Sequence, residues 1–202
     1  TIDGGEGVDI LRVTGGDVDL STATLSSIEK IQANSASLAL TQAQYDSFAG
    51  NISGDAGLIL KLTESGVSSV DGLPASFVGI RGASGNDTIT GSDGPDLLVG
   101  DAGNDSIVGG VGDDRLVGGS GNDILQGQGG NDYLVSGEGV DSLLGGDGND
   151  TIVISDKFMV RDQISGGSGT DTLWVSDDQN LTLSNISGIE VLKGSGTVTL
   201  SA

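Results

Sequence analysis

Residues 82–153 can be written as eight consecutive rows of nine residues. The rows read GASGNDTIT, GSDGPDLLV, GDAGNDSIV, GGVGDDRLV, GGSGNDILQ, GQGGNDYLV, SGEGVDSLL and GGDGNDTIV. Glycine occupies position 4, aspartate position 6 and isoleucine or leucine position 8 in all eight rows, and glycine occupies position 1 in seven. A fixed short period of this kind indicates a solenoid, in which each unit buries its apolar side chain only against its neighbours.

The residue type at each position of the row predicts the local structure. Glycines at positions 1 and 4 allow backbone angles that other residues avoid, so the first six residues can turn sharply. Positions 7–9 are mostly aliphatic and partly β-branched, which favours a three-residue strand. Two rows then form one coil, and successive coils stack as parallel strands about 4.8 Å apart. The position-8 side chains should line a narrow core: Ile89, Leu98, Ile107, Leu116, Leu125, Leu134, Leu143 and Ile152.

The same stacking places the position-6 aspartates in two ladders, one on each edge of the solenoid. One ladder contains Asp87, Asp105, Asp123 and Asp141, and the other contains Asp96, Asp114, Asp132 and Asp150. Like charges this close destabilise the fold unless a cation lies between them. Carboxylates and glycine-loop carbonyls provide the flexible all-oxygen shell that calcium prefers, whereas magnesium requires a smaller and stricter octahedron. Because the chain has no histidine or cysteine, zinc and copper sites are not expected.

Composition and charge exclude several classes of function. The chain has 29 acidic and 8 basic residues, which gives a net charge of −21 and makes nucleic acid and anionic membranes unsuitable partners. It has no apolar run of transmembrane length. With no histidine to activate a serine and no cysteine nucleophile, we expect no enzymatic activity. The chain starts with threonine and shows no signal peptide, so we interpret it as a segment of a longer protein.

The rows resemble the GGxGxDx(aliphatic)x nonapeptide of the RTX, or repeats-in-toxin, calcium-binding family. Isolated copies recur at residues 4–12 (GGEGVDILR) and 166–174 (GGSGTDTLW), and residues 162–164 restore half a repeat. The resemblance implies an all-β fold: a parallel β-roll, which is a right-handed β-solenoid, with irregular β-solenoid layers on both sides. It also implies export by type I secretion and folding outside the cell.

The resemblance further implies that calcium ions lie between successive turns, bound by position-6 carboxylates and by backbone carbonyls of positions 1–4. About six to eight ions or more are expected. The implied carboxylate ligands are Asp87, Asp96, Asp105, Asp114, Asp123, Asp132, Asp141 and Asp150, with Asp9, Asp162 and Asp171 from the flanking copies. The implied carbonyl ligands are Gly82, Ala83, Ser84, Gly85, Gly91, Ser92, Asp93, Gly94, Gly100, Asp101, Ala102, Gly103, Gly109, Gly110, Val111, Gly112, Gly118, Gly119, Ser120, Gly121, Gly127, Gln128, Gly129, Gly130, Ser136, Gly137, Glu138, Gly139, Gly145, Gly146, Asp147 and Gly148.

Three parts are expected along the chain. Residues 1–81 form an irregular β module with one RTX-like turn, residues 82–153 form the regular calcium β-roll, and residues 154–202 contain an interrupting loop and a second irregular β module. Within the first module, TQAQYDSF (41–48) has a threonine followed three residues later by glutamine. This pattern predicts a capping box at the start of a short helix.

The two flanking modules share a Ser-x-Ile-Glu sequence, at residues 26–29 and 187–190. We expect a solvated or structural role for Glu29 and Glu190, with an additional ion contact as the alternative. Trp174 is expected in the core or as a cap, with a platform for a ligand as the alternative.

The flanking modules also resemble modules of large bacterial RTX surface proteins, including S-layer-like proteins and adhesins. Together the resemblances imply a calcium-binding structural segment of a secreted bacterial surface protein, of S-layer or adhesin type, which folds on export into calcium-rich medium. Besides calcium, the expected partners are other copies of the chain or components of the cell surface. The alternative is a C-terminal-type RTX domain that assists the secretion and folding of an exported enzyme or toxin. Carbohydrate binding is a weaker alternative, because the sequence does not reveal a groove lined with aromatic residues.

Overall fold

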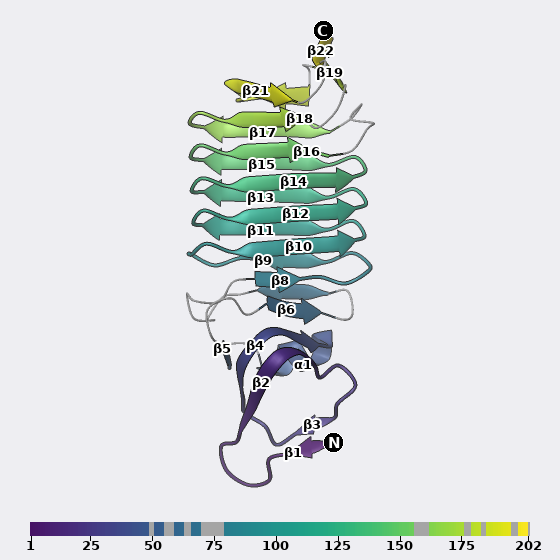
Figure 1. Ribbon diagram of the computed structural model, residues 1–202, viewed down its shortest axis with the longest axis vertical. Helices are drawn as coiled ribbons and strands as arrows, with labels where there is room; N and C mark the ends of the chain where they lie inside the picture. The colour runs from purple at the N-terminus through teal and green to yellow at the C-terminus, as the bar shows by residue number, and fades with distance from the viewer. Residues whose placement is uncertain are drawn as a thin grey trace.

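The chain forms an elongated stack of parallel strands with its two termini at opposite ends (Figure 1). The structure, a computed structural model, describes residues 1–48, 51–54, 59–62, 66–69, 79–155, 162–175, 179–182, 185–194 and 198–201. Within the regular roll, alternate strands belong to two large sheets, so each coil contributes one strand to each sheet. This arrangement is the all-β parallel roll that the repeat predicts.

The first sheet contains β2 (Ile10–Asp19), β4 (Lys30–Leu40), β6 (Ile59–Leu62), β8 (Gly79–Arg81), β10 (Leu97–Ala102), β12 (Arg115–Ser120), β14 (Tyr133–Glu138), β16 (Thr151–Ile154), β18 (Thr172–Val175) and β21 (Val191–Gly194) in this order, and β5 (Ile52–Gly54) pairs with β4. The second sheet contains β7 (Val67–Ser69), β9 (Thr88–Thr90), β11 (Ser106–Val111), β13 (Ile124–Gly129), β15 (Ser142–Asp147), β17 (Gln163–Ser168) and β20 (Ile186–Ser187). Two short pairs lie outside these sheets: β1 (Ile2–Asp3) with β3 (Leu25–Ser26), and β19 (Gln179–Thr182) with β22 (Val198–Ser201).

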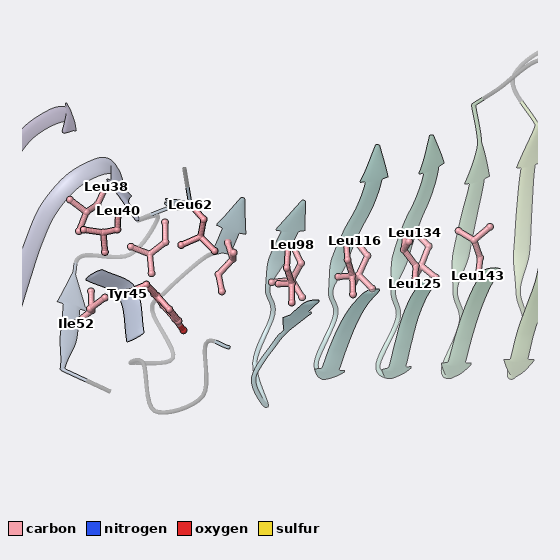
Figure 2. Packing of buried hydrophobic residues seen from close by; sticks show 14 of the residues in the cluster. Leu38, Leu40, Tyr45, Ile52, Leu62, Leu98, Leu116, Leu125, Leu134 and Leu143 are labelled. Atoms are coloured by element: carbon pink, nitrogen blue, oxygen red, sulfur yellow. The ribbon is translucent and has the colours of Figure 1, made fainter. Parts of the chain in front are cut away.

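The strand register confirms the predicted two-row coil. In the first sheet Leu98 pairs with Leu116, which in turn pairs with Leu134. In the second sheet Ile107 pairs with Leu125. The eight position-8 side chains are at most 1% exposed and belong to one apolar core cluster. Figure 2 shows five of them, Leu98, Leu116, Leu125, Leu134 and Leu143, stacked along the roll. The core therefore lies where the repeat predicts it, and the glycine turns lie at the edges of the coils.

The strands of the roll are longer than the sequence predicts. We expected three residues at positions 7–9, but β11 and its neighbours extend over six residues, into positions 1–3 of the next row. Parallel pairing continues there, for example between Gly110 and Gln128. The glycines of positions 1 and 2 thus lie within paired strands, with a positive φ at position 2 as at Gly110 (114°), and the turn between strands lies in positions 4–6.

The flanking layers continue the same sheets on both sides of the roll. β6 pairs with β8 and β8 with β10 at one end, and β16 pairs with β18 and β18 with β21 at the other. The domain boundaries at residues 81/82 and 153/154 stay a prediction. After the interruption, Gln163 pairs with Ser142, so the roll resumes in register with three residues added to the coil. Residues 156–161 of the predicted loop lie outside the described part of the chain.

The predicted helix is α1 (Gln42–Phe48). Its capping box is formed as expected, since the Thr41 Oγ1 accepts a hydrogen bond from the Gln44 N–H at 3.2 Å and the Gln44 Oε1 accepts one from the Thr41 N–H at 2.9 Å. Tyr45 and Phe48 are buried and pack into the core.

Two non-glycine residues at position 2 adopt a left-handed backbone, Asp101 (φ 77°) and Gln128 (φ 78°). Replacing Gln128 with glycine should raise the free energy of unfolding by about 1 kcal/mol, because glycine adopts this conformation without steric cost. Asp101→Gly should gain less, since it also removes the ion pair in which Arg81 Nε lies 2.6 Å from the Asp101 carboxylate. Chemical denaturation in calcium checks both variants, and equal gains would contradict this account.

Candidate metal centre

The position-6 aspartates form two continuous hydrogen-bonded ladders along the edges of the roll. In each step, the backbone N–H of one aspartate donates to the Oδ1 of the aspartate in the next coil, at 2.8–2.9 Å. The first ladder runs through Asp87, Asp105, Asp123, Asp141 and Asp162. The second runs through Asp96, Asp114, Asp132, Asp150 and Asp171. The structure thus places ten predicted carboxylates in two rows and extends each row beyond the regular repeat.

These carboxylates are buried at the edges of a strongly acidic chain. All ten are at most 6% exposed. Their Oδ1 atoms are engaged in the ladder, but the Oδ2 atoms of seven of them are buried without a hydrogen-bond partner among the described residues: Asp105, Asp114, Asp123, Asp132, Asp150, Asp162 and Asp171. A buried carboxylate oxygen without a partner costs a large part of its solvation energy. A repeated arrangement of this kind indicates that a cation completes the site.

A position-1 glycine lies beside the Oδ2 of eight of the ten ladder aspartates. A Cβ added to Gly82 would lie 2.6 Å from the Asp87 Oδ2 and 2.6 Å from the carbonyl oxygen of Gly100 in the next coil. The same pair of oxygens surrounds the corresponding point at Gly91, Gly100, Gly109, Gly118, Gly127, Gly145 and Gly166. A carboxylate oxygen and a backbone carbonyl oxygen therefore converge on one small region between successive coils, where a side chain would not fit.

This donor set fits calcium. Every oxygen belongs to a carboxylate or a backbone carbonyl, and the adjacent coil supplies a second carboxylate. Within the described ranges, no group of three or more acidic side chains is close enough to hold a metal ion by itself. The backbone-carbonyl ligands that the resemblance implies therefore stay a prediction.

The predicted carbonyl ligands differ in their surroundings. Position-1 carbonyls face the carboxylates, as at Gly100 and Gly118. Position-3 carbonyls already accept a hydrogen bond from a position-4 N–H of the preceding coil, as Ala102 does from Gly85 and Ser120 from Gly103. Position-1 carbonyls are the stronger candidates, and the complete ligand set stays a prediction.

Burial raises the pKa of six ladder carboxylates: Asp105, Asp114, Asp123, Asp132, Asp150 and Asp162. Desolvation is the main cause, and repulsion from adjacent carboxylates adds to it at three residues, whereas the hydrogen bond from the backbone N–H opposes it. The pKa rises to about 6 for Asp105 and Asp150 and to about 7 for Asp114. Because two adjacent charges are unfavourable in this environment without a cation, protons and calcium should compete for the same oxygens.

The raised pKa values predict opposite effects of pH with and without calcium. In chelator, the folded carboxylates bind protons between about pH 7 and pH 4, whereas unfolded aspartates do so only near pH 4, so acidification should stabilise the fold. In millimolar calcium, acidification over the same range should destabilise it, because protons displace the ion. Denaturation curves at several pH values check both signs, and a pH-independent stability in chelator would contradict the burial of charged carboxylates.

Sequence reasoning missed a second ladder, at position 5. The Oδ1 of Asn86 accepts a hydrogen bond from the Asn104 N–H at 2.8 Å, and Asn104 accepts one from Asn122 at 2.7 Å. On the other edge, Asp113 accepts one from Asn131, and Asn131 from Asn149. Asparagine at position 5 in five of the eight rows is the signal that could have revealed it.

Ser136 is the one position-1 residue of the regular rows that is not glycine. Its side chain is fully buried, and its Oγ has no hydrogen-bond partner among the described residues. A hydroxyl therefore stands where the other rows leave open space. The site of this coil should differ from the others in its ligands.

The outer face of the first sheet carries a shallow groove of about 360 Å³. It is lined by Tyr133, Thr151, Val153, Thr172, Trp174 and Lys193. Trp174 is 43% exposed, so the expectation that it lies in the core is wrong. Strand alternation explains this, because the neighbouring Leu173 and Val175 take the inward positions of β18. Because Tyr133 and Trp174 both line this groove, the expectation that the chain lacks an aromatic-lined groove is wrong as well. That expectation had weakened the carbohydrate alternative.

Comparison with known proteins agrees with the geometry. The family model of the RTX calcium-binding nonapeptide repeat matches the chain in four copies, at residues 81–116, 108–143, 117–152 and 161–181. RTX repeats bind calcium, and their family indicates an exported protein. The chain has no significant match to a curated protein or to a solved structure. None of the helices in the described ranges is long and apolar enough to cross a membrane.

Proposed function

Because the chain carries RTX calcium-binding repeats, we propose that it is a calcium-rigidified structural segment of a secreted bacterial surface protein, of S-layer or adhesin type. The observation that carries this proposal is the pair of continuous ladders of buried carboxylates, in which seven Oδ2 atoms are buried without a hydrogen-bond partner among the described residues. A chain built in this way depends on its cations to form a rigid stack, and the extended shape suits a spacer or assembly role better than a compact catalytic one (Figure 1).

Charge supports folding outside the cell. Eight successive Asp–Asp pairs with one ion each would add 16 positive charges to a net charge of −21. With an extracellular-type affinity of ~0.1 mM, each site contributes about 1.4 kcal/mol at ~1 mM calcium and almost nothing at cytosolic calcium. Summed over the sites, this is comparable to the stability of a whole domain. The chain would therefore remain loose before export by type I secretion and fold on meeting external calcium.

The continuity of the sheets supports a structural role over the alternative of a C-terminal-type secretion domain. The irregular layers extend the first sheet at both ends of the roll instead of ending it. To test this, sedimentation velocity and electron microscopy would follow the chain in calcium and in chelator. Calcium-dependent ordered oligomers would support the surface-assembly role. A strictly monomeric chain that raises the calcium-dependent refolding yield of a fused enzyme would support the alternative instead.

The groove on the first sheet favours a second candidate, binding of an acidic saccharide. Tyr133 and Trp174 provide aromatic faces, and the threonines provide hydroxyl groups between them. All lysines and arginines within the described ranges lie on strands of the first sheet: Arg12, Lys30, Lys61, Arg81, Arg115 and Lys193. A glycan microarray in calcium would test this candidate. Binding that Trp174→Ala abolishes, but that Leu144→Ala on the second sheet preserves, would support it; no binding would remove it.

A further inference from the structure

Glu29 and Glu190 take the place of a position-6 aspartate in the two flanking layers. Lys30 pairs with Ile10, and Val191 pairs with Thr172, so each glutamate directly precedes a residue in the position-7 register. Within the regular roll, aspartate holds this position in every row. The two glutamates are therefore equivalent to ladder residues, although they lie in sequences without the nonapeptide pattern.

Each glutamate makes the contact that defines the ladder. The backbone N–H of Asp171 donates to the Glu190 Oε2 at 2.9 Å, and the N–H of Asp9 donates to the Glu29 Oε2 at 2.7 Å. These contacts correspond to the 2.8 Å hydrogen bond from the Asp105 N–H to the Asp123 Oδ1 in the roll. Glu190 thus forms the last step of the second ladder.

The aspartate whose N–H donates to each glutamate has a carboxylate oxygen available for a ligand. The Oδ2 atoms of Asp9 and Asp171 are buried without a hydrogen-bond partner among the described residues, and Asp171 is fully buried. A Cβ added to Gly166 would meet the Asp171 Oδ2 and the carbonyl oxygen of Gly188. A Cβ added to Gly4 would meet the Asp9 side chain and the carbonyl oxygen of Ser27.

A shared short turn explains why glutamate replaces aspartate. In the roll, the facing carbonyl precedes the carboxylate residue by five positions, as Gly118 precedes Asp123. In the flanking layers it precedes the glutamate by only two positions, in Ser27-Ile28-Glu29 and Gly188-Ile189-Glu190. Ser27 (φ 51°) and Gly188 (φ 59°) both adopt the left-handed conformation that makes this tight turn. The longer glutamate side chain then reaches back across the shortened turn.

We propose that Asp9 with Glu29, and Asp171 with Glu190, form two additional calcium sites, built from a nonapeptide turn on one side and a Ser-x-Ile-Glu turn on the other. This inference rests on the proposed calcium-binding function and extends it beyond the regular repeat. In both sites a glutamate takes the place of a ladder aspartate. Calcium, the ion that stabilises the roll, would then also stabilise the irregular layers.

Counting bound calcium by native mass spectrometry of the full chain tests the proposal. Glu190→Gln and Glu29→Gln each keep an oxygen that can accept the aspartate N–H but remove the charge. Each variant should bind one ion fewer than the unmodified chain, and the double variant two fewer, with an unchanged far-UV circular dichroism spectrum. Asp46→Asn, at an exposed position of α1 outside every proposed site, should retain every ion.

The outcomes separate this inference from the proposed function. Unchanged ion counts in both glutamine variants would overturn the two additional sites while leaving the aspartate ladders intact. Loss of the whole complement of ions from either variant would also overturn them, because a single site should be lost. An unmodified chain that binds no calcium would instead contradict the function on which the inference rests.

Discussion

Asp123→Asn is expected to destabilise the calcium-bound chain by about 3 kcal/mol and to stabilise the calcium-free chain. Asp123 lies between Asp105 and Asp141 in the first ladder, so its carboxylate serves the sites on both of its sides. At ~1 mM calcium and an affinity of ~0.1 mM, each site contributes about 1.4 kcal/mol. Without calcium, burial raises the pKa of Asp123, and the neutral amide removes this unfavourable charge while retaining the Oδ1 acceptor.

Urea denaturation in calcium and in chelator would measure both signs. Asp113→Asn provides the matched control, because Asp113 lies beside a ladder residue but its Oδ1 accepts a hydrogen bond from Asn131 in the position-5 ladder. The control should change the stability by less than about 0.5 kcal/mol in either condition. If Asp123→Asn destabilised the chain equally with and without calcium, the Asp123 carboxylate would not be a metal ligand.

Gly118→Ala should have an effect at least as large, for a steric reason. Its Cβ would lie 2.5 Å from the carbonyl oxygen of Ser136 and would meet the Asp123 Oδ2. Overpacking costs about 1–3 kcal/mol, and the site between these oxygens would be lost as well. We expect the free energy of unfolding in calcium to fall by about 3–4 kcal/mol, and the chain to bind one ion fewer.

Gly129→Ala is the control for this prediction. A Cβ at Gly129 would meet nothing within 4 Å, and the residue has no positive φ. Thermal unfolding and native mass spectrometry should therefore show a variant close to the unmodified chain. Equal losses in Gly118→Ala and Gly129→Ala would mean that strand propensity, and not the space beside the carboxylate, explains why glycine occupies position 1.

The fold of the regular roll could be predicted from the sequence because one short period determines both the core and the edges. Leu116 and Asp114 have fixed places once the row length is known, and the register of β12 and β14 follows. The length of the strands could not be predicted in the same way. Glycine has a low strand propensity, yet Gly110 pairs within the sheet because the coils above and below impose the register.

The candidate site was predictable in its carboxylates and less so in its other members. The period identifies Asp123 directly, and the flanking copies identify Asp9 and Asp171. The interpretation of Glu29 and Glu190 remained open, because the turn that precedes them has a different length and only the strand register shows that they occupy position 6. Trp174 was misplaced because aromatic residues are usually buried, whereas alternation along β18 turns it outward.

Far-UV circular dichroism during a calcium titration tests the central claim most directly. The chain would start in chelator, with magnesium as the control ion. The aspartate ladders predict a cooperative gain of β-structure that is specific to calcium, because buried carboxylates without partners oppose the fold until the ion binds. A chain that is fully β-structured in chelator, and whose spectrum calcium leaves unchanged, would contradict calcium-driven folding.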